Sequence, residues 1–197
     1  MANAIFDVSS LNGLILTGGR STRMGQDKSQ LVYHGQPQRD YLTELLKPYC
    51  QQIFWSVNKV QAVELAGVKQ AYIVDTFDWP GPLNGILSAL NQNPETAWLV
   101  VACDMPLLTN RSLNALVQGR NSAKVATVFY DSDGQLPEPL LGIYEPAFRP
   151  ILQRAVADGR YSPRQLLQQN DSQLLTSPDI RELTNINDPT ARAKSGL

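Results

Sequence analysis

The sequence has few of the residues that define disulfide-rich proteins and thiol enzymes. Its 197 residues include two cysteines, Cys50 and Cys103, and one histidine, His34. Two cysteines are too few for a disulfide framework, which favours a reducing cytoplasm, and neither lies in a cysteine–histidine pattern. His34 stands in a turn beside Gly35, so we assign it no catalytic role.

Strong net charge and long apolar runs are also absent. The formal net charge is −1, which gives no reason to expect binding to nucleic acid or to a membrane. No apolar run approaches the ~20 residues of a membrane-spanning helix. Residues 1–10 carry no signal-peptide pattern, and we expect them to be an N-terminal lead to one domain over residues 11–197.

The chain does contain short apolar runs that alternate with helical patterns. Hydrophobic residues make up 43% of the chain and charged residues 18%, values typical of a globular domain. We expect strands at 14–16, 53–57, 71–74, 98–102, 125–130 and 139–144, and helices at 37–47, 60–66, 82–91, 146–157 and 163–168. This order predicts a single three-layer, Rossmann-like α/β domain with a mostly parallel sheet and an antiparallel excursion within 125–144.

The chain is organised around residues 11–28, which read LNGLILTGGRSTRMGQDK. An apolar strand ends at Gly18 and Gly19, which let a ligand approach the backbone, and a basic loop with Arg23 and Lys28 follows. Backbone N–H groups and cations in such a loop can hold phosphate. The loop lacks both the Gly-Lys-Ser/Thr ending of a P-loop and the G-x-G-x-x-G dinucleotide spacing. A glycine-rich turn with solvated charges is the alternative interpretation.

Polar side chains follow three further expected strands. Asn58 and Asp75 each fit a helix cap or an Asx turn as well as a ligand contact. Asp104 follows an apolar strand, where a carboxylate is costly to bury alone; Mg²⁺ would offset that cost, and a helix cap is the alternative. The loop from Pro80 to Gly85 precedes a helix whose N-terminus would add partial positive charge near these strand ends, unless it is an ordinary Pro-Gly turn. Because ligands bind at the carboxyl ends of parallel strands, these residues are candidates for one site.

Four segments together resemble one family, the MobA-like nucleotidyltransferases, and specifically the molybdenum cofactor guanylyltransferases. The segments are G-G-x-S-x-R-M-G-x-D-K at 18–28, P-G-P-L-x-G-I at 80–86, C-D-M-P at 103–106 and N-I-N-x-P at 185–189. The resemblance runs from Leu14 to about Thr190 and is weak between Ser122 and Leu183. Thr17 departs from the usual L-A-G-G, and Asp188 replaces the threonine of N-I-N-T-P.

The resemblance implies a fold of the nucleotide-diphospho-sugar transferase type and a Mg²⁺-dependent transfer of GMP from GTP to molybdopterin, with release of pyrophosphate. It implies triphosphate binding by Arg23 and Lys28 and a Mg²⁺ carboxylate in Asp104. The nucleotide contacts that it implies are Leu16, Thr17, Gly18, Gly19, Lys28, Asn58, Asp75, Gly81, Gly85 and Asp104. The roles of Asn185 and Asn187 are left open. In one interpretation Asn187 reaches the metal or the second substrate. In the other, Asp188 and Pro189 simply start a terminal helix.

The resemblance further implies a cytoplasmic monomer with transient contacts to cofactor-insertion proteins or molybdoenzymes. Two alternatives keep the chemistry and change the substrates: a cytidylyltransferase for the same pterin, and a sugar-1-phosphate nucleotidyltransferase. Those families more often show A-A-G at the strand end, whereas the R-M-G-x-D-K ending favours the guanylyl class. A non-catalytic nucleotide- or cofactor-binding protein is the alternative from another class, and the presence of Lys28 and Asp104 argues against it.

Overall fold

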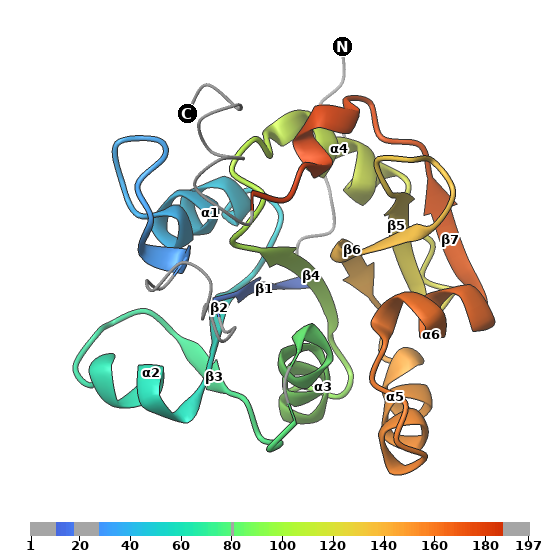
Figure 1. Cartoon of the computed structure of the whole chain (residues 1–197), viewed down its shortest axis with the longest axis horizontal. Helices are drawn as coiled ribbons and strands as arrows, with labels where there is room; N and C mark the ends of the chain where they lie inside the picture. Colours follow the sequence, from blue (N-terminus) through green and yellow to red (C-terminus); the bar gives the residue numbers. More distant parts are fainter. Residues whose placement is uncertain (1–10, 18–27, 80, 187–197) are drawn as a thin grey trace.

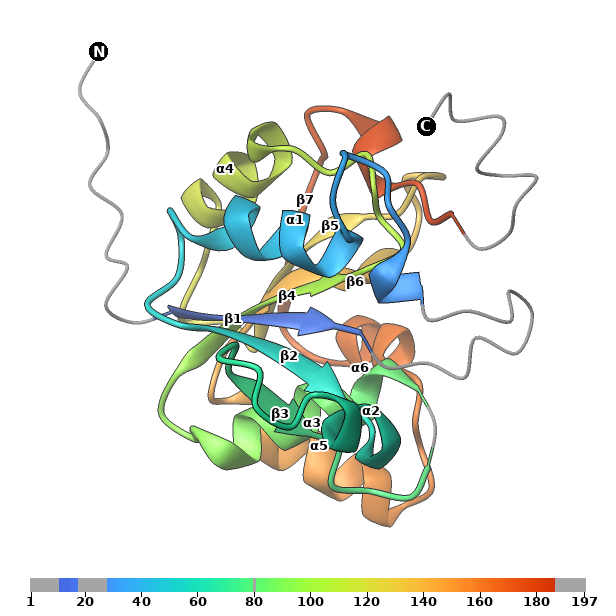
Figure 2. The same ribbon diagram turned by 90° about the vertical axis from the view of Figure 1, so that its left-hand side faces the viewer.

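The computed structural model describes residues 11–17, 28–79 and 81–186, and arranges them with one β-sheet between two layers of helices (Figures 1 and 2). The strands are β1 (Leu11–Leu16), β2 (Ile53–Val57), β3 (Tyr72–Val74), β4 (Ala97–Ala102), β5 (Ala126–Tyr130), β6 (Pro137–Tyr144) and β7 (Ser172–Leu175). The helices are η2 (Lys28–Gln30), α1 (Gln38–Leu46), α2 (Lys59–Glu64), α3 (Pro82–Gln92), α4 (Asn110–Gln118), α5 (Phe148–Ala157), α6 (Pro163–Gln169) and η3 (Ile180–Leu183).

The sheet has the order β3-β2-β1-β4-β6-β5-β7. β1 pairs in parallel with β2 and β4, β2 with β3, and β5 with β7. β6 runs antiparallel to both of its neighbours, β4 and β5. The predicted mostly parallel sheet with an antiparallel excursion is therefore confirmed. The sequence analysis missed η2, β7 and η3, because all three are short and β7 has no buried residue to produce a periodic pattern.

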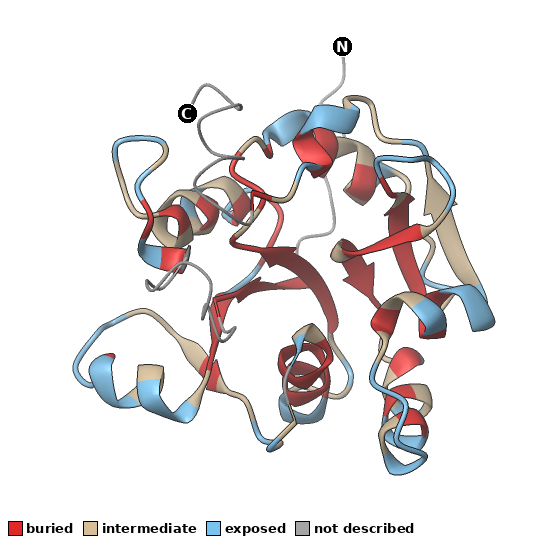
Figure 3. Ribbon diagram, in the orientation of Figure 1, coloured by how far each residue is buried: buried red, intermediate tan, exposed pale blue. Residues whose placement is uncertain are grey.

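The central strands are apolar on both faces because helices cover both faces. Successive side chains of a strand point to opposite sides. In β4, Trp98 and Val100 pack with α3, α5 and α6, whereas Leu99 and Val101 pack with α1 and α4. All four residues are fully buried, and β1 is buried along its whole length (Figure 3). These two cores fix the strands whose ends carry the candidate site.

An ion pair joins the end of α4 to the junction between β6 and α5. Arg120 Nε donates to Glu145 Oε1 at 2.7 Å and Arg120 Nη2 to Glu145 Oε2 at 3.0 Å. The Arg120 side chain is 19% exposed and the Glu145 side chain 3% exposed. Because Tyr144 pairs with Trp98, Glu145 lies at the edge of the sheet where β4 begins.

None of the helices in the described ranges is both long and apolar enough to cross a membrane.

Candidate functional site

The carboxyl ends of four neighbouring strands meet at one edge of the sheet, which faces the viewer in Figure 1. The register aligns Leu16 of β1 with Ser56 of β2 and Ala102 of β4, and Val57 of β2 with Val74 of β3. The residues that follow these strands, including Asn58, Asp75 and Asp104, are thereby brought to the same edge, as predicted.

The end of β1 is locked to β2 before the glycine loop starts. The Thr17 hydroxyl and backbone N–H donate to the Ser56 carbonyl at 2.6 and 3.2 Å, and Gln61 Nε2 donates to the Thr17 carbonyl at 3.3 Å. The Leu16 carbonyl accepts from Cys103 N at 3.3 Å. The backbone here is therefore rigid, and several of the groups proposed to contact a nucleotide already bind neighbouring strands.

Asn58 begins helix α2. Its Oδ1 accepts from the backbone N–H groups of Val60 and Gln61, both at 2.9 Å, while Gln61 Oε1 accepts from Asn58 N at 3.0 Å. This is a complete capping box. The capping interpretation of Asn58 is confirmed. Because Oδ1 is used in the cap, a nucleotide could contact only the amide nitrogen or the backbone of Asn58.

Asp75 follows β3 and is half-buried against the end of β2. Ser56 Oγ donates to Asp75 Oδ1 at 2.8 Å, and Asp75 N donates to the Val57 carbonyl at 2.8 Å. Burial raises the pKa of the Asp75 carboxyl, and the Ser56 hydrogen bond partly opposes the rise. One carboxylate oxygen is thus fixed by Ser56, which orients the group at the strand ends.

The loop before α3 is held by one side chain. Asn84 Nδ2 donates to the carbonyls of Phe77 and Trp79 at 2.8 and 2.9 Å, and Asn84 Oδ1 accepts from Phe77 N at 3.3 Å. Pro82 occupies the first turn, as predicted, and Gly81 has φ +114°. A side chain at Gly81 would strain this backbone whatever it did to a bound base, so Gly81 is a poor position for testing base contacts by substitution.

Gly85 lets α3 approach the sheet closely. A Cβ at this position would clash with Ser56 Oγ and would lie 2.9 Å from Leu16 Cδ2. We expect Gly85→Ala to lower the free energy of unfolding by about 1–3 kcal/mol, because overpacking forces α3 away from β1 and β2. Urea unfolding measures this, and adding Ser56→Ala should restore part of the loss. A Gly85→Ala variant as stable as the wild type would contradict the proposed close packing.

Asp104 lies just beyond β4, opposite the start of β6. The register pairs Trp98 with Tyr144 and Val101 with Leu141. Asp104 follows the end of β4 and Glu138 is the second residue of β6, so both lie at this edge of the sheet. The two carboxylates interact electrostatically, since Asp104 raises the pKa of Glu138.

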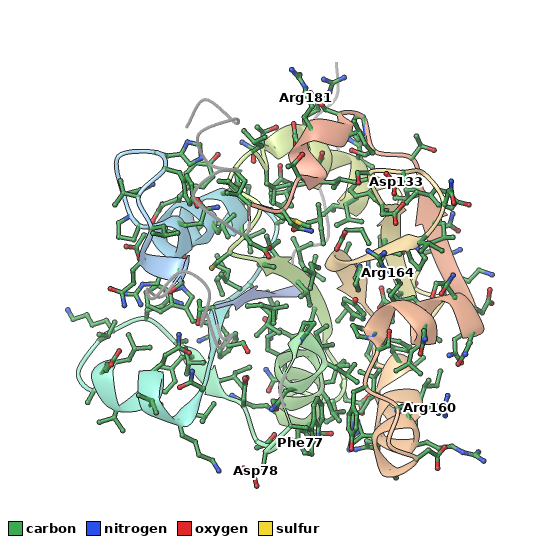
Figure 4. The ribbon with its side chains drawn as sticks, viewed as in Figure 1. Phe77, Asp78, Asp133, Arg160, Arg164 and Arg181 are labelled. Carbon is green, nitrogen blue, oxygen red and sulfur yellow. The ribbon has the colours of Figure 1, made fainter. Side chains whose placement is uncertain are left out.

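Glu138 is 4% exposed and belongs to a charged group with Asp131 and Arg164. Arg164 Nη1 lies 3.3 Å from Asp131 Oδ2, and Nη2 lies 3.8 Å from Glu138 Oε2. Burial raises the pKa of Glu138 most strongly, the Leu140 N–H and Arg164 lower it, and the carboxylates of Asp104 and Asp131 raise it again. Figure 4 shows Arg164 on α6, beside β6. The sequence analysis did not select this group.

The segment after Asp104 is supported from α1. His34 Nε2 lies 2.7 Å from the Pro106 carbonyl, and the His34 ring stacks on Tyr41 with centroids 4.0 Å apart. Gln38 Nε2 donates to the Met105 carbonyl at 3.4 Å. His34 therefore supports the segment after Asp104 through its contact with the Pro106 carbonyl.

The segment that follows η3 lies next to Asp104. Ile186 N donates to the Asp104 carbonyl at 2.7 Å, and among the residues that the structure describes none donates a hydrogen bond to the buried Oδ1 of the neighbouring Asn185. Glu182 anchors this segment by accepting from Thr109 N and Thr109 Oγ1 at 3.0 and 2.6 Å. Asn185 is thus held next to Asp104, whereas Asn187 and Asp188 lie outside the described residues.

A cavity of about 260 Å³ opens at the carboxyl ends of β1 and β2. It is lined by Thr17, Gln30, Arg39, Val57, Gln61, Glu64 and Leu65. The Arg39 guanidinium lies 4.5 Å from the centroid of the Trp55 ring, and its Nε is buried without a hydrogen-bond acceptor. Because Thr17 and Gln30 flank the loop in sequence, the cavity adjoins the expected phosphate site.

The loop itself is only partly described. Gly18, Gly19 and Arg23 lie outside the described residues, and Lys28 is seen as the first residue of η2. Within the described ranges, no three His, Cys, Asp or Glu side chains form a preformed metal centre. The Asp104 carboxylate at this edge is of the ligand type that Mg²⁺ takes when it also binds the phosphates of a substrate.

Known proteins resemble this chain over most of its length. A molybdenum cofactor guanylyltransferase of Pseudomonas fluorescens is 32% identical over 180 residues, which are 89% of this chain and 88% of that protein. A molybdenum cofactor biosynthesis bifunctional protein of Synechocystis is 36% identical over 93% of this chain, and the chain spans 53% of its length, about half.

Solved structures share the fold. The molybdopterin-guanine dinucleotide biosynthesis protein A of Archaeoglobus fulgidus superposes with a TM-score of 0.77 at 22% identity, over 94% of this chain and 100% of that one. A 4-diphosphocytidyl-2C-methyl-D-erythritol synthase of Anaerococcus prevotii superposes with a TM-score of 0.66 at 11% identity, covering 100% of both chains. These likenesses support the predicted nucleotidyltransferase type of fold. Residues 13–174 match the model of the MobA-like NTP transferase domain, and the chain therefore belongs to this family of nucleotidyltransferases.

Proposed function

We propose that the protein is a molybdenum cofactor guanylyltransferase. In this reaction a terminal phosphate oxygen of molybdopterin bonds to the α-phosphorus of GTP, while the bond to the bridging oxygen breaks and pyrophosphate leaves. The observation that carries the proposal is the position of Asp104, which stands at the same sheet edge as the start of the glycine loop. Such transfer needs positioning and charge neutralisation more than covalent participation by the protein.

Mg²⁺ is the cofactor that fits these residues best. Asp104 would hold it, since carboxylate oxygens are the ligands this ion prefers, and the NTP phosphates would complete its shell. When bound, Mg²⁺ neutralises charge on the phosphates and polarises them. The buried, donor-free oxygen of Asn185 is a further oxygen next to Asp104 in this part of the chain.

The nucleotide would lie across the ends of β1, β2 and β3. Arg23 and Lys28 would neutralise the triphosphate, and the backbone around Gly18 and Gly19 would cradle it. Asp75 is oriented by Ser56 at this edge and offers a carboxylate oxygen to donors of the nucleoside. The walls of this nucleotide site would be completed by Leu16, Thr17, Asn58, Gly81 and Gly85.

The test is an incubation of the protein with Mg²⁺, molybdopterin and each of the four nucleoside triphosphates in turn. We expect pyrophosphate release with GTP, because a site that pairs the edge groups of guanine leaves buried partners unsatisfied with another base, at about 1–3 kcal/mol each. A preference for CTP would favour the cytidylyl alternative. Release only with a sugar 1-phosphate would favour the sugar-nucleotide class, and no release with any acceptor would favour a binding protein.

Lys28→Ala is expected to weaken GTP binding and slow transfer together, by about 10²-fold in kcat/KM, because the ammonium meets charge on both bound and departing phosphate. Lys28→Arg should restore only part of the rate, since a planar guanidinium does not replace a compact ammonium. Calorimetry with GTP and initial rates measure both effects. Lys47→Ala is the control, because Lys47 is exposed in a surface pair with Glu44. If Lys28→Ala had the GTP affinity and the rate of the wild type, Lys28 would be a solvated charge that does not act on the triphosphate.

The acceptor, the partners and the location remain predictions. We propose a cytoplasmic monomer that passes its product to cofactor-insertion proteins or molybdoenzymes through transient contacts.

A further inference from the structure

The antiparallel strand β6 brings a second carboxylate to the edge where Asp104 stands. β4 ends at this edge, whereas β6 starts there, because the two strands run in opposite directions. The recorded pairs end with Val101 opposite Leu141, so Asp104, just past the end of β4, and Glu138, near the start of β6, lie at the same edge and interact electrostatically. The carboxylates of Asp104 and Glu138 repel each other unless a positive charge lies close to them.

Arg164 is shared between two carboxylates. Its guanidinium lies against Asp131 and Glu138, so it offsets only one of their two negative charges. Within the described ranges, hydrogen bonding to the Glu138 carboxylate is limited to Leu140 N, which donates to Oε1 at 2.9 Å. The other oxygen, Oε2, has the ion pair with Arg164 at 3.8 Å, which is too long for a hydrogen bond. A side chain that is 4% exposed therefore keeps one oxygen without a donor in this part of the chain.

We propose that Glu138 holds the divalent cation of the enzyme together with Asp104. The inference rests on the proposed function and adds a residue that the family motifs do not carry. A hard cation such as Mg²⁺ is commonly bound by one or two carboxylates, and it would offset the negative charge that Arg164 leaves. In this arrangement the Leu140 N–H, which donates to Oε1, orients Glu138, and Arg164 competes with the cation for the same carboxylate.

A purely structural role for Glu138 is the alternative, in which it serves only to anchor α6 through Arg164. The two roles differ in what Arg164→Gln does. If Glu138 only anchors α6, Glu138→Gln and Arg164→Gln should have the same consequences. If Glu138 holds a cation, removing Arg164 takes away a competing positive charge and leaves the carboxylate in place.

The experiment titrates the full chain with Mn²⁺, alone and with GTP, and follows free Mn²⁺ by electron paramagnetic resonance at constant pH. We expect Glu138→Gln to weaken Mn²⁺ binding by about 10- to 100-fold. Arg164→Gln should bind Mn²⁺ at least as tightly as the wild type, and Asp104→Asn should lose binding. Asp133→Asn is the matched control, because Asp133 lies in the exposed turn between β5 and β6 (Figure 4).

Equal Mn²⁺ affinity in the wild type and Glu138→Gln overturns the proposal, as does parallel weakening in Glu138→Gln and Arg164→Gln. A wild-type protein that binds no Mn²⁺ in either condition overturns it too. Circular dichroism checks each variant, and Glu138→Asp, which keeps the charge and shortens the reach, replaces Glu138→Gln if that variant does not fold. If the protein bound Mn²⁺ through Glu138 but transferred no nucleotide to any acceptor, the guanylyltransferase function would be wrong, whereas the assignment of Glu138 as a cation ligand would hold.

Discussion

Asp104→Asn is expected to slow nucleotidyl transfer by about 10²- to 10³-fold, the usual cost of removing one preorganised electrostatic group. Asparagine keeps the size of the side chain and one oxygen, so Ile186 N can still donate to the backbone carbonyl of residue 104, as it does at 2.7 Å in the wild type. The loss should therefore appear in the rate and not in the fold. Pyrophosphate release under saturating GTP, measured across a range of Mg²⁺ concentrations, gives the effect.

The Mg²⁺ series separates two causes of a slow Asp104→Asn variant. If Asp104 is a metal ligand, the variant needs more Mg²⁺ to reach its maximal rate. Asp133→Asn makes the same chemical change in an exposed turn and should behave like the wild type. An Asp104→Asn variant with wild-type rate at limiting Mg²⁺ would defeat the metal assignment.

The first half of the chain could be predicted well because its signals are local. The buried strand β4 is apolar throughout, and a polar residue directly follows each of β1, β2 and β3. Asn58 shows the limit of this reasoning. Its position at the end of β2 could be predicted, and the spacing of Asn58 and Gln61 is the capping-box pattern that the structure forms, but the sequence analysis did not use this spacing to choose between a cap and a ligand contact.

Glu138 was missed because of the direction of its strand. The rule that ligands gather at the carboxyl ends of strands holds for a parallel sheet. In an antiparallel strand the opposite end reaches that edge, so the residues to examine are the first ones of β6. The clue available in the sequence was a glutamate between Pro137 and Pro139 at the start of an apolar run. Pairing it with Asp104 needed the β4–β6 register, which only the structure provides.

Glu145→Gln is expected to cost about 3 kcal/mol in the free energy of unfolding, because removing one partner of a buried ion pair leaves the other charge poorly compensated. The bonds at 2.7 and 3.0 Å to Arg120 make this a two-point contact. Arg120 keeps 19% of its side chain exposed, which places the cost toward the lower end of the range for buried pairs. Urea unfolding, with the slope of the transition compared among variants, measures the change.

The location of Glu145 separates its effect from catalysis. It lies at the edge where β4 begins, opposite the candidate site, so Glu145→Gln should keep its GTP affinity at temperatures where it is folded. Asp158→Asn is the control: it breaks a pair with Arg160 whose side chains are 53% and 47% exposed, and such pairs contribute about 0–1 kcal/mol. Replacing both partners, as in Arg120→Met with Glu145→Leu, should recover most of the loss, since a buried pair and a packed apolar pair have similar stability. If Glu145→Gln stayed within about 0.5 kcal/mol of the wild type, the pair would not be what holds α4 to the β6–α5 junction.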